Sequence, residues 1–140
     1  MFEFIDTAVT GDQFLLALHD TLVMIAVSLG FGSLLGIPLG IVLVVCRPGG
    51  ILPNRFVHQV LNPIINVVRS LPFIILLITI LPFTRLVVGT TIGTAGAIVP
   101  LIVFIAPYIS RLVESSLLEV DEGILEAADA MGATALQTIW

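Results

Sequence analysis

Residues 21–46 read TLVMIAVSLGFGSLLGIPLGIVLVVC and contain no charged side chain. As a helix, this stretch of 26 residues is about 39 Å long, which exceeds the roughly 30 Å thickness of the hydrocarbon core of a bilayer. It is followed by Arg47-Pro48-Gly49-Gly50, where a charge, a helix breaker and two flexible residues come together. We therefore predict a first membrane-spanning helix over residues 21–46.

Small residues recur every four positions within this span, at Ser28, Gly32, Gly36 and Gly40. Residues four apart lie on one face of a helix, so these four form a ridge along it. Such a ridge allows a second helix to approach closely inside a membrane. We interpret it as a packing surface and not as a substrate contact. We also expect Pro38 to kink the helix, because proline removes one backbone hydrogen bond.

Two further spans are predicted. The next uncharged stretch, residues 70–84, is too short to cross a bilayer alone, so we place the second span over about residues 60–82, with Arg69 inside it. The third covers about residues 95–117. Prolines are expected to break or kink these spans, as in many transporters, at Pro63, Pro72, Pro82, Pro100 and Pro107.

Arg69 is the candidate functional charge in these spans. An arginine inside a membrane segment is a functional candidate by default. One near the interface instead anchors the helix by extending its guanidinium to the headgroups. Arg69 is thus a candidate membrane-interface or pathway residue.

The composition agrees with a polytopic membrane helical bundle of the all-α class. Of the 140 residues, 58% are hydrophobic and 11% charged, and the mean hydropathy is +1.18, whereas soluble domains are about half apolar and a quarter charged. A soluble enzyme domain and a disordered chain are excluded. Cys46 has no partner for a disulfide. The net charge of −5, without any lysine, makes nucleic acid an unexpected partner.

The first twenty residues are acidic. They contain Glu3, Asp6, Asp12 and Asp20 and neither Lys nor Arg, whereas a secretory signal begins with positive charges. We therefore expect residues 1–20 to remain as a periplasmic or interfacial segment, with a short surface helix within residues 3–18.

The arginines predict the orientation. Four fall on one side of the predicted spans and one, Arg85, on the other; the four are Arg47, Arg55, Arg69 and Arg111. By the positive-inside rule, the N-terminus is outside and the last segment is cytoplasmic. The predicted location is the bacterial inner membrane.

Residues 119–140 predict two short helices joined by a turn. Asp121 is a plausible N-cap, Gly132 can end the first helix, and Thr134 with Gln137 has the spacing of a capping box for the second. On the first helix one shallow face suits close docking to another protein; it comprises Ile124, Ala127, Ala128 and Met131.

At these residues the sequence resembles a known family. Glu126-Ala127-Ala128, three residues and Gly132 resemble the E-A-A-x-x-x-G core of the coupling loop in the permease subunits of bacterial ATP-binding-cassette (ABC) importers. The resemblance implies that Glu126, Ala127, Ala128 and Gly132 are ATPase-coupling positions. They would dock on a separate cytosolic ATPase subunit.

A broader resemblance is to the permease subunits of methionine importers. It is carried by Arg47-Pro48-Gly49, Arg69-Ser-Leu-Pro72-Phe73, Pro82-Phe83-Thr84-Arg85, Gly89-Thr90-Thr91-Ile92-Gly93, Ala97-Ile-Val-Pro100-Leu101 and Ala106-Pro107-Tyr108-Ile109-Ser110-Arg111. It implies a homodimer in the lipid membrane, an ATPase partner, an external substrate-binding lipoprotein and transport of L- or D-methionine or a related amino acid. Family members have five spans, so the chain, with three, resembles a truncated permease.

No catalytic or metal site is predicted. His19 and His58 lie on opposite sides of the first span, and Glu119, Asp121 and Glu122 lack the spacing of a calcium loop. The chain has no phosphate-binding loop, so ATP hydrolysis is expected from the partner, and no cofactor is expected in this chain. Two alternatives stay open: a small structural or assembly protein of the inner membrane, and an ABC permease for another small solute.

Overall fold

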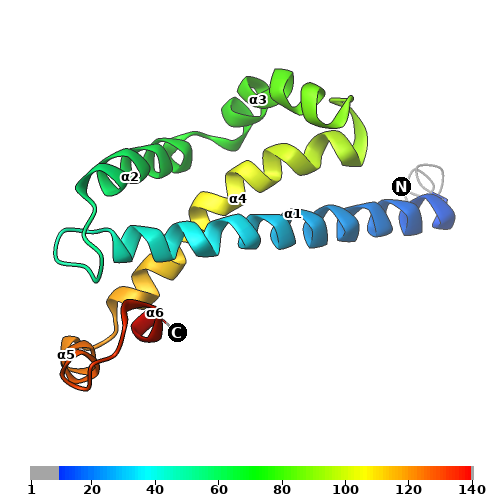
Figure 1. The fold of residues 1–140 in the computed structure, drawn as a ribbon. Coiled ribbons are helices and arrows are strands. Elements are labelled where there is room, and N and C mark those ends of the chain that lie inside the picture. Colours follow the sequence, from blue (N-terminus) through cyan, green and yellow to red (C-terminus); the bar gives the residue numbers. More distant parts are fainter. Residues whose placement is uncertain (1–9, 140) are drawn as a thin grey trace, which may run out of the picture.

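The computed structural model describes residues 10–139, and these form helices without any strand. The predicted all-α class is confirmed. The helices, in chain order, are α1 (Gly11–Val45), α2 (Arg55–Ser70), α3 (Phe73–Val88), α4 (Gly93–Leu118), α5 (Glu122–Ala130) and α6 (Ala135–Ile139). In Figure 1, α1 and α4 cross at the centre, α2 and α3 lie above them, and the two short helices lie below the end of α4.

The first helix begins earlier than predicted. A capping box starts α1, in which the backbone N–H of Thr10 donates to Oε1 of Gln13 over 3.2 Å. Residues 11–18, expected in a separate surface helix, are the first turns of α1, so that prediction is wrong for them; residues 1–9 lie outside the described part of the chain. The helix also runs through Pro38 without interruption (Figure 1).

The ridge of small residues is where α1 meets α4. Ser28, Gly32, Gly36 and Gly40 are all buried, which confirms the predicted packing surface. A β-carbon added to Gly36 would lie 2.7 Å from the carbonyl oxygen of Ala106. Such a distance leaves no room for a side chain, so glycine is required for this close approach.

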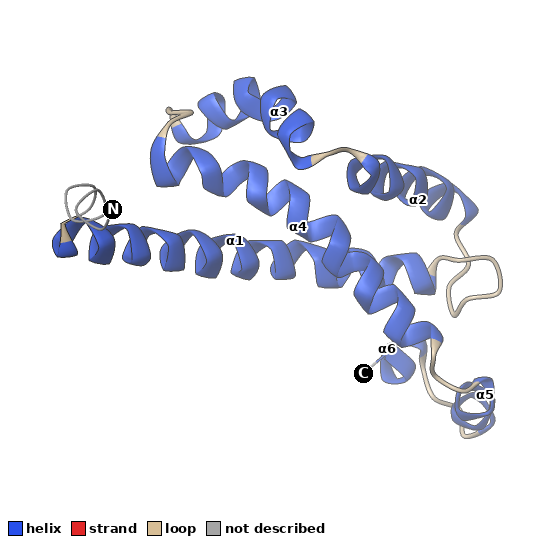
Figure 2. Cartoon of the chain, turned by 180° about the vertical axis from the view of Figure 1, so that it is seen from behind, coloured by secondary structure: helices blue, strands red, loops and turns tan. Residues whose placement is uncertain are grey.

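The second predicted span is not one helix. α2 and α3 are bent by 114° at the break between Ser70 and Phe73, which confirms the break expected at Pro72 (Figure 2). The cause is Pro72, because a residue before proline avoids the helical conformation. Leu71 accordingly adopts extended backbone, with φ −78° and ψ 131°.

Two helices of the described chain, α1 and α4, are long and apolar enough to cross a membrane, and the bent α2–α3 pair can count as a third span. The bounds of α4 match the predicted third span to within two residues. Large apolar side chains are exposed along α1 and α3, among them Leu34 and Leu86. Such a surface is typical of lipid-facing or subunit-facing helices.

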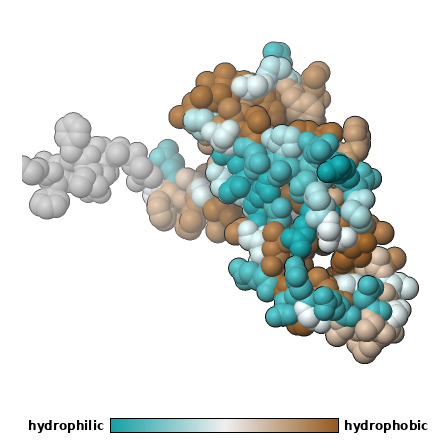
Figure 3. Space-filling view, turned by 90° about the vertical axis from the view of Figure 1, so that its left-hand side faces the viewer, coloured by the Kyte–Doolittle hydropathy of each residue, from teal (hydrophilic) through white to brown (hydrophobic). Residues whose placement is uncertain are grey.

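The end of the molecule where α1 meets α2 is polar. Figure 3 looks onto this end and shows hydrophilic side chains gathered there, with hydrophobic ones above them. The corner is tied by His58, whose Nδ1 lies 3.3 Å from the carbonyl oxygen of Leu43 near the end of α1. His19 lies in the third turn of α1, near the opposite end of that helix from this corner.

Candidate functional site

The two short helices after α4 form as the sequence predicts. α5 starts at Asp121, whose Oδ1 accepts from the backbone N–H of Gly123 over 2.7 Å. Glu122 follows in the first turn, where a negative charge is favourable to the helix dipole. The predicted N-cap is therefore confirmed.

The end of α5 is fixed by Gly132. Its φ of 76° is a left-handed conformation that favours glycine. The backbone N–H of Gly132 donates to Asp129 O over 2.9 Å, and that of Ala133 donates to Ala128 O over 3.0 Å. This pair of bonds is the Schellman motif, which turns the chain sharply out of the helix.

The second helix starts at once. The backbone N–H of Thr134 donates to Oε1 of Gln137 over 2.9 Å, which is one half of a capping box. The Thr134 hydroxyl also donates to this oxygen, over 3.0 Å, instead of accepting from the backbone of Gln137. The turn and both helices are therefore as predicted, while the cap differs in the role of the hydroxyl.

The four predicted coupling residues lie together on α5 and its C-terminal turn. Glu126, Ala127 and Gly132 are exposed and Ala128 is half-buried. On the same helix the apolar Ile124 is 63% exposed and Met131 is 82% exposed. Apolar side chains left open beside alanines form a shallow surface of the kind that another protein covers.

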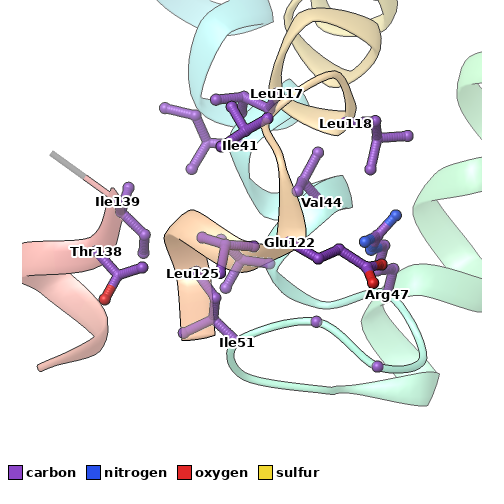
Figure 4. Close-up of a pocket in the computed structure, with 14 residues that line it drawn as sticks. Ile41, Val44, Arg47, Ile51, Leu117, Leu118, Glu122, Leu125, Thr138 and Ile139 are labelled. Atoms are coloured by element: carbon purple, nitrogen blue, oxygen red, sulfur yellow. The ribbon is translucent and has the colours of Figure 1, made fainter. Parts of the chain in front are cut away.

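One side of α5 borders a cavity that it shares with the membrane helices. Leu125 lines this cavity of about 220 Å³, together with residues of the end of α1, the end of α4 and α6. Figure 4 shows Leu125 on the same side of the cavity as Ile51, with Ile41, Val44 and Leu117 across from it and Ile139 of α6 at the side. The cavity thus has α5 on one side and the ends of both long helices on the other.

Arg47 and Glu122 line the polar side of the same cavity. In Figure 4 the side chain of Glu122 extends toward Arg47, which comes from the loop after α1. From the sequence, Arg47 marked the end of the first span, the orientation and a family resemblance, but not a place beside the short helices. Its position after a span gave no signal for this proximity, because Arg47 and Glu122 are 75 positions apart.

A polar cluster between α2 and α4 was also missed. Arg111 donates to Glu114, to Oδ1 of Asn62 and, over 2.7 Å, to Oδ1 of Asn66. Asn62 and Asn66 are four residues apart on an apolar helix, and Arg111 and Glu114 are three apart. These two spacings, which place each pair on one helix face, were the available signal.

Arg69 lies apart from the coupling residues, in the last turn of α2. Its guanidinium carbon is 5.1 Å from the centre of the Tyr108 ring on α4. The guanidinium thus stacks on a ring between helices, in a cation–π arrangement. The structure brings Glu126, Ala127, Ala128 and Gly132 together and leaves Arg69 at the α2–α3 break.

Comparisons with known proteins agree with this architecture. Residues 32–140 match the family of binding-protein-dependent transport system inner membrane components. The chain is 52% identical over 120 residues to the D-methionine transport system permease protein MetI of Yersinia pestis, and 50% identical to that of Escherichia coli K12. Both alignments cover 86% of this chain and 55% of the relative, so the chain spans about half the length of these curated relatives.

A solved structure of similar fold is a chain of the MetNI methionine ABC transporter in inward-facing conformations. The TM-score is 0.86 at 46% identity, over 94% of this chain and 62% of that chain. The family match, over residues 32–140, includes α2 to α6 and the part of α1 from Gly32 onward, which packs on α4. The chain belongs to the family of binding-protein-dependent transport system inner membrane components.

Proposed function

We propose that the chain is a membrane-spanning permease component of an ABC importer that carries methionine, of either hand, or a related amino acid across the inner membrane. The observation that carries this proposal is the pairing of an open surface on α5 with a mainly apolar cavity that α5 shares with the ends of α1 and α4. Similarity to the D-methionine permeases supports the substrate class.

The mechanism follows from the position of α5 between two contacts. Its exposed side, with Glu126 and Ala127, would lie against a separate ATPase subunit, which supplies the hydrolysis of ATP. Its other side carries Leu125, which lines the cavity shared with the ends of α1 and α4. A movement of the ATPase would thereby change the packing of the spans without any cofactor or catalytic group in this chain.

The remaining partners follow from the same proposal. The permease works as two copies in lipid, and an external substrate-binding protein delivers the amino acid. The N-terminus lies outside, because the loop after α1 carries Arg47 and Arg55 and belongs on the cytoplasmic side. α5 and α6 then face the cytosol, where the ATPase is.

Co-purification tests the docking role. The permease chain, expressed in full with a candidate ATPase from the same cells, should retain the ATPase. Glu126→Lys and Gly132→Val should each lower the amount retained, because the first reverses an exposed charge and the second disturbs the turn at positive φ. Glu119→Lys, an equally exposed charge reversal outside the motif, is the matched control.

Uptake of labelled methionine tests the substrate. Cells that lack the chromosomal copy should lose uptake and regain it with the intact chain. If the ATPase does not co-purify, or if both motif variants bind it normally, the alternative of an assembly protein with another cytosolic partner replaces the importer. If the ATPase binds but methionine uptake is unaffected by deletion, the permease carries another solute.

A further inference from the structure

Two arginines face the contact between α2 and α4, and their surroundings differ. Arg111 reaches Glu114, Asn62 and Asn66 with its terminal nitrogens, and its side chain is only 18% exposed. Arg69 is half-buried; its buried Nε, like that of Arg111, has no hydrogen-bond partner among the described residues, but its terminal nitrogens make none of the side-chain bonds that Arg111 makes. The ion pairs found within residues 10–139 involve Arg111 and His19 but not Arg69.

Arg69 lies deep in the predicted membrane region. It stacks on Tyr108, which lies between Ala106 and Ile109 on α4, and both of those residues contact the Gly36 position of α1. Gly36 is ten residues before Cys46, which corresponds to about 15 Å along the helix. The predicted span end at Cys46 therefore puts Arg69 well inside a core roughly 30 Å thick.

A cation at this depth calls for an anion. An intramembrane arginine faces a cavity or a partner in almost every case, because leaving its charge unpaired in hydrocarbon is costly. The Tyr108 ring meets only part of this need, since an aromatic face offers weaker attraction than a carboxylate. The planar guanidinium is suited to binding both oxygens of one carboxylate.

An aromatic row continues from this arginine. The Tyr108 and Phe104 ring centres are 5.0 Å apart, and the Phe104 and Phe73 ring centres are 5.2 Å apart. Tyr108 is 40% exposed, so the row is open at its arginine end. Aromatic rings make favourable contacts with thioether sulfur and with apolar side chains.

We propose that Arg69 and the aromatic row Tyr108, Phe104 and Phe73 form a transit site for a zwitterionic amino acid with an apolar or thioether side chain. Arg69 binds the α-carboxylate, and the rings contact the side chain. This inference rests on the proposed function. A lipid phosphate has similar chemistry, but headgroups lie at the membrane surface and Arg69 lies well inside the core.

The test uses the complete transporter in vesicles, with the ATPase and saturating binding protein, and measures methionine delivered per ATP hydrolysed. Arg69→Gln should lower uptake about tenfold or more, as expected for the loss of a charge-assisted contact. ATP hydrolysis stimulated by the binding protein should stay near the unmodified level, because Arg69 is remote from α5. Arg55→Gln, at an exposed arginine that begins α2, should change neither quantity.

Further variants separate a binding role from a structural one. Tyr108→Leu removes the ring and should lower methionine uptake several-fold. Arg69→Lys keeps the charge without the planar fork and should transport poorly, and it replaces Arg69→Gln if that variant does not assemble. In these variants, a ratio of methionine delivered to ATP hydrolysed equal to that of the unmodified transporter would overturn the transit site, whether both rates fall together or neither changes.

The lipid arm repeats the measurement in vesicles of phosphatidylcholine alone and of phosphatidylcholine with phosphatidylglycerol. The transit site predicts the same deficit for Arg69→Gln in both, and a deficit confined to the anionic vesicles would assign Arg69 to an anionic lipid headgroup instead. Normal methionine uptake by the Arg69→Gln transporter would refute the transit site and leave the proposed function standing. An unmodified transporter that takes up none refutes the proposed function.

Discussion

Along α1, the glycines of the ridge face α4 at distances that exclude any side chain, whereas on α5 Ala127 and Gly132 face open space. A β-carbon on Gly40 would lie 2.5 Å from the carbonyl oxygen of Ser110. One on Gly132 would meet nothing within 4 Å. The same kind of small residue is therefore already covered in one region and left uncovered in the other.

The difference separates stability from binding. Where small residues are covered, enlarging one must push two helices apart. Where they are exposed, as at Ala127, enlarging one should leave the fold of the spans intact and obstruct what would dock there; at Gly132 the positive φ adds a cost that falls on the turn. The long-helix contact should thus respond to substitution mainly in unfolding, and α5 mainly in partner binding.

The largest expected effect is that of Gly36→Val. The added β-carbon would lie 2.7 Å from Ala106 O and 2.8 Å from the β-carbon of Ile109, so the variant should lose about 3 kcal/mol of unfolding free energy. Thermal unfolding of the purified complex in detergent measures this. Gly30→Val is the matched control, because a β-carbon at Gly30 meets nothing within 4 Å; equal losses in the two variants would contradict the ridge.

Arg111→Met comes next. It leaves the Glu114 carboxylate, which is 14% exposed, without its cation and removes the link from α4 to Asn62 and Asn66. A loss of about 2 kcal/mol is expected in the same unfolding measurement. Adding Glu114→Gln should recover part of that loss, because the double variant has no uncompensated charge. A double variant less stable than Arg111→Met would refute this ion-pair explanation.

Gly132→Ala should have a smaller effect on unfolding. An alanine at φ 76° costs about 1 kcal/mol, and this cost falls on the turn between α5 and α6 and not on the spans. Limited proteolysis should therefore show faster cleavage near residue 132 while the melting temperature of the spans is unchanged. Protection equal to that of the unmodified chain would show that the turn tolerates a side chain.

The sequence predicted these two regions because local rules govern them. The ridge follows from a spacing of four residues within an uncharged stretch, and α5 follows from Asp121 and Gly132 at its two ends. Both depend on neighbours along the chain, so periodicity and capping were enough. The third span, α4, was predicted for the same reason.

The errors arose where one local signal outweighed another or where the contact is long-range. A break at Pro72 was predicted, but the bend of 114° between α2 and α3 was not. The acidic residues before residue 21 suggested a separate surface segment, yet good helix formers continue α1 from Gly11. The Arg111 cluster joins residues up to 49 positions apart, which no local pattern specifies.

The central claim is that α5 borders the ends of the spans on one side and offers its other side to an ATPase. Ala127→Leu tests it most directly, because it adds bulk to an exposed position on a helix without altering a cap. Titration of the ATPase onto the complete permease should show affinity reduced about tenfold or more, with an unchanged melting temperature. Unimpaired ATPase binding by Ala127→Leu would contradict the account.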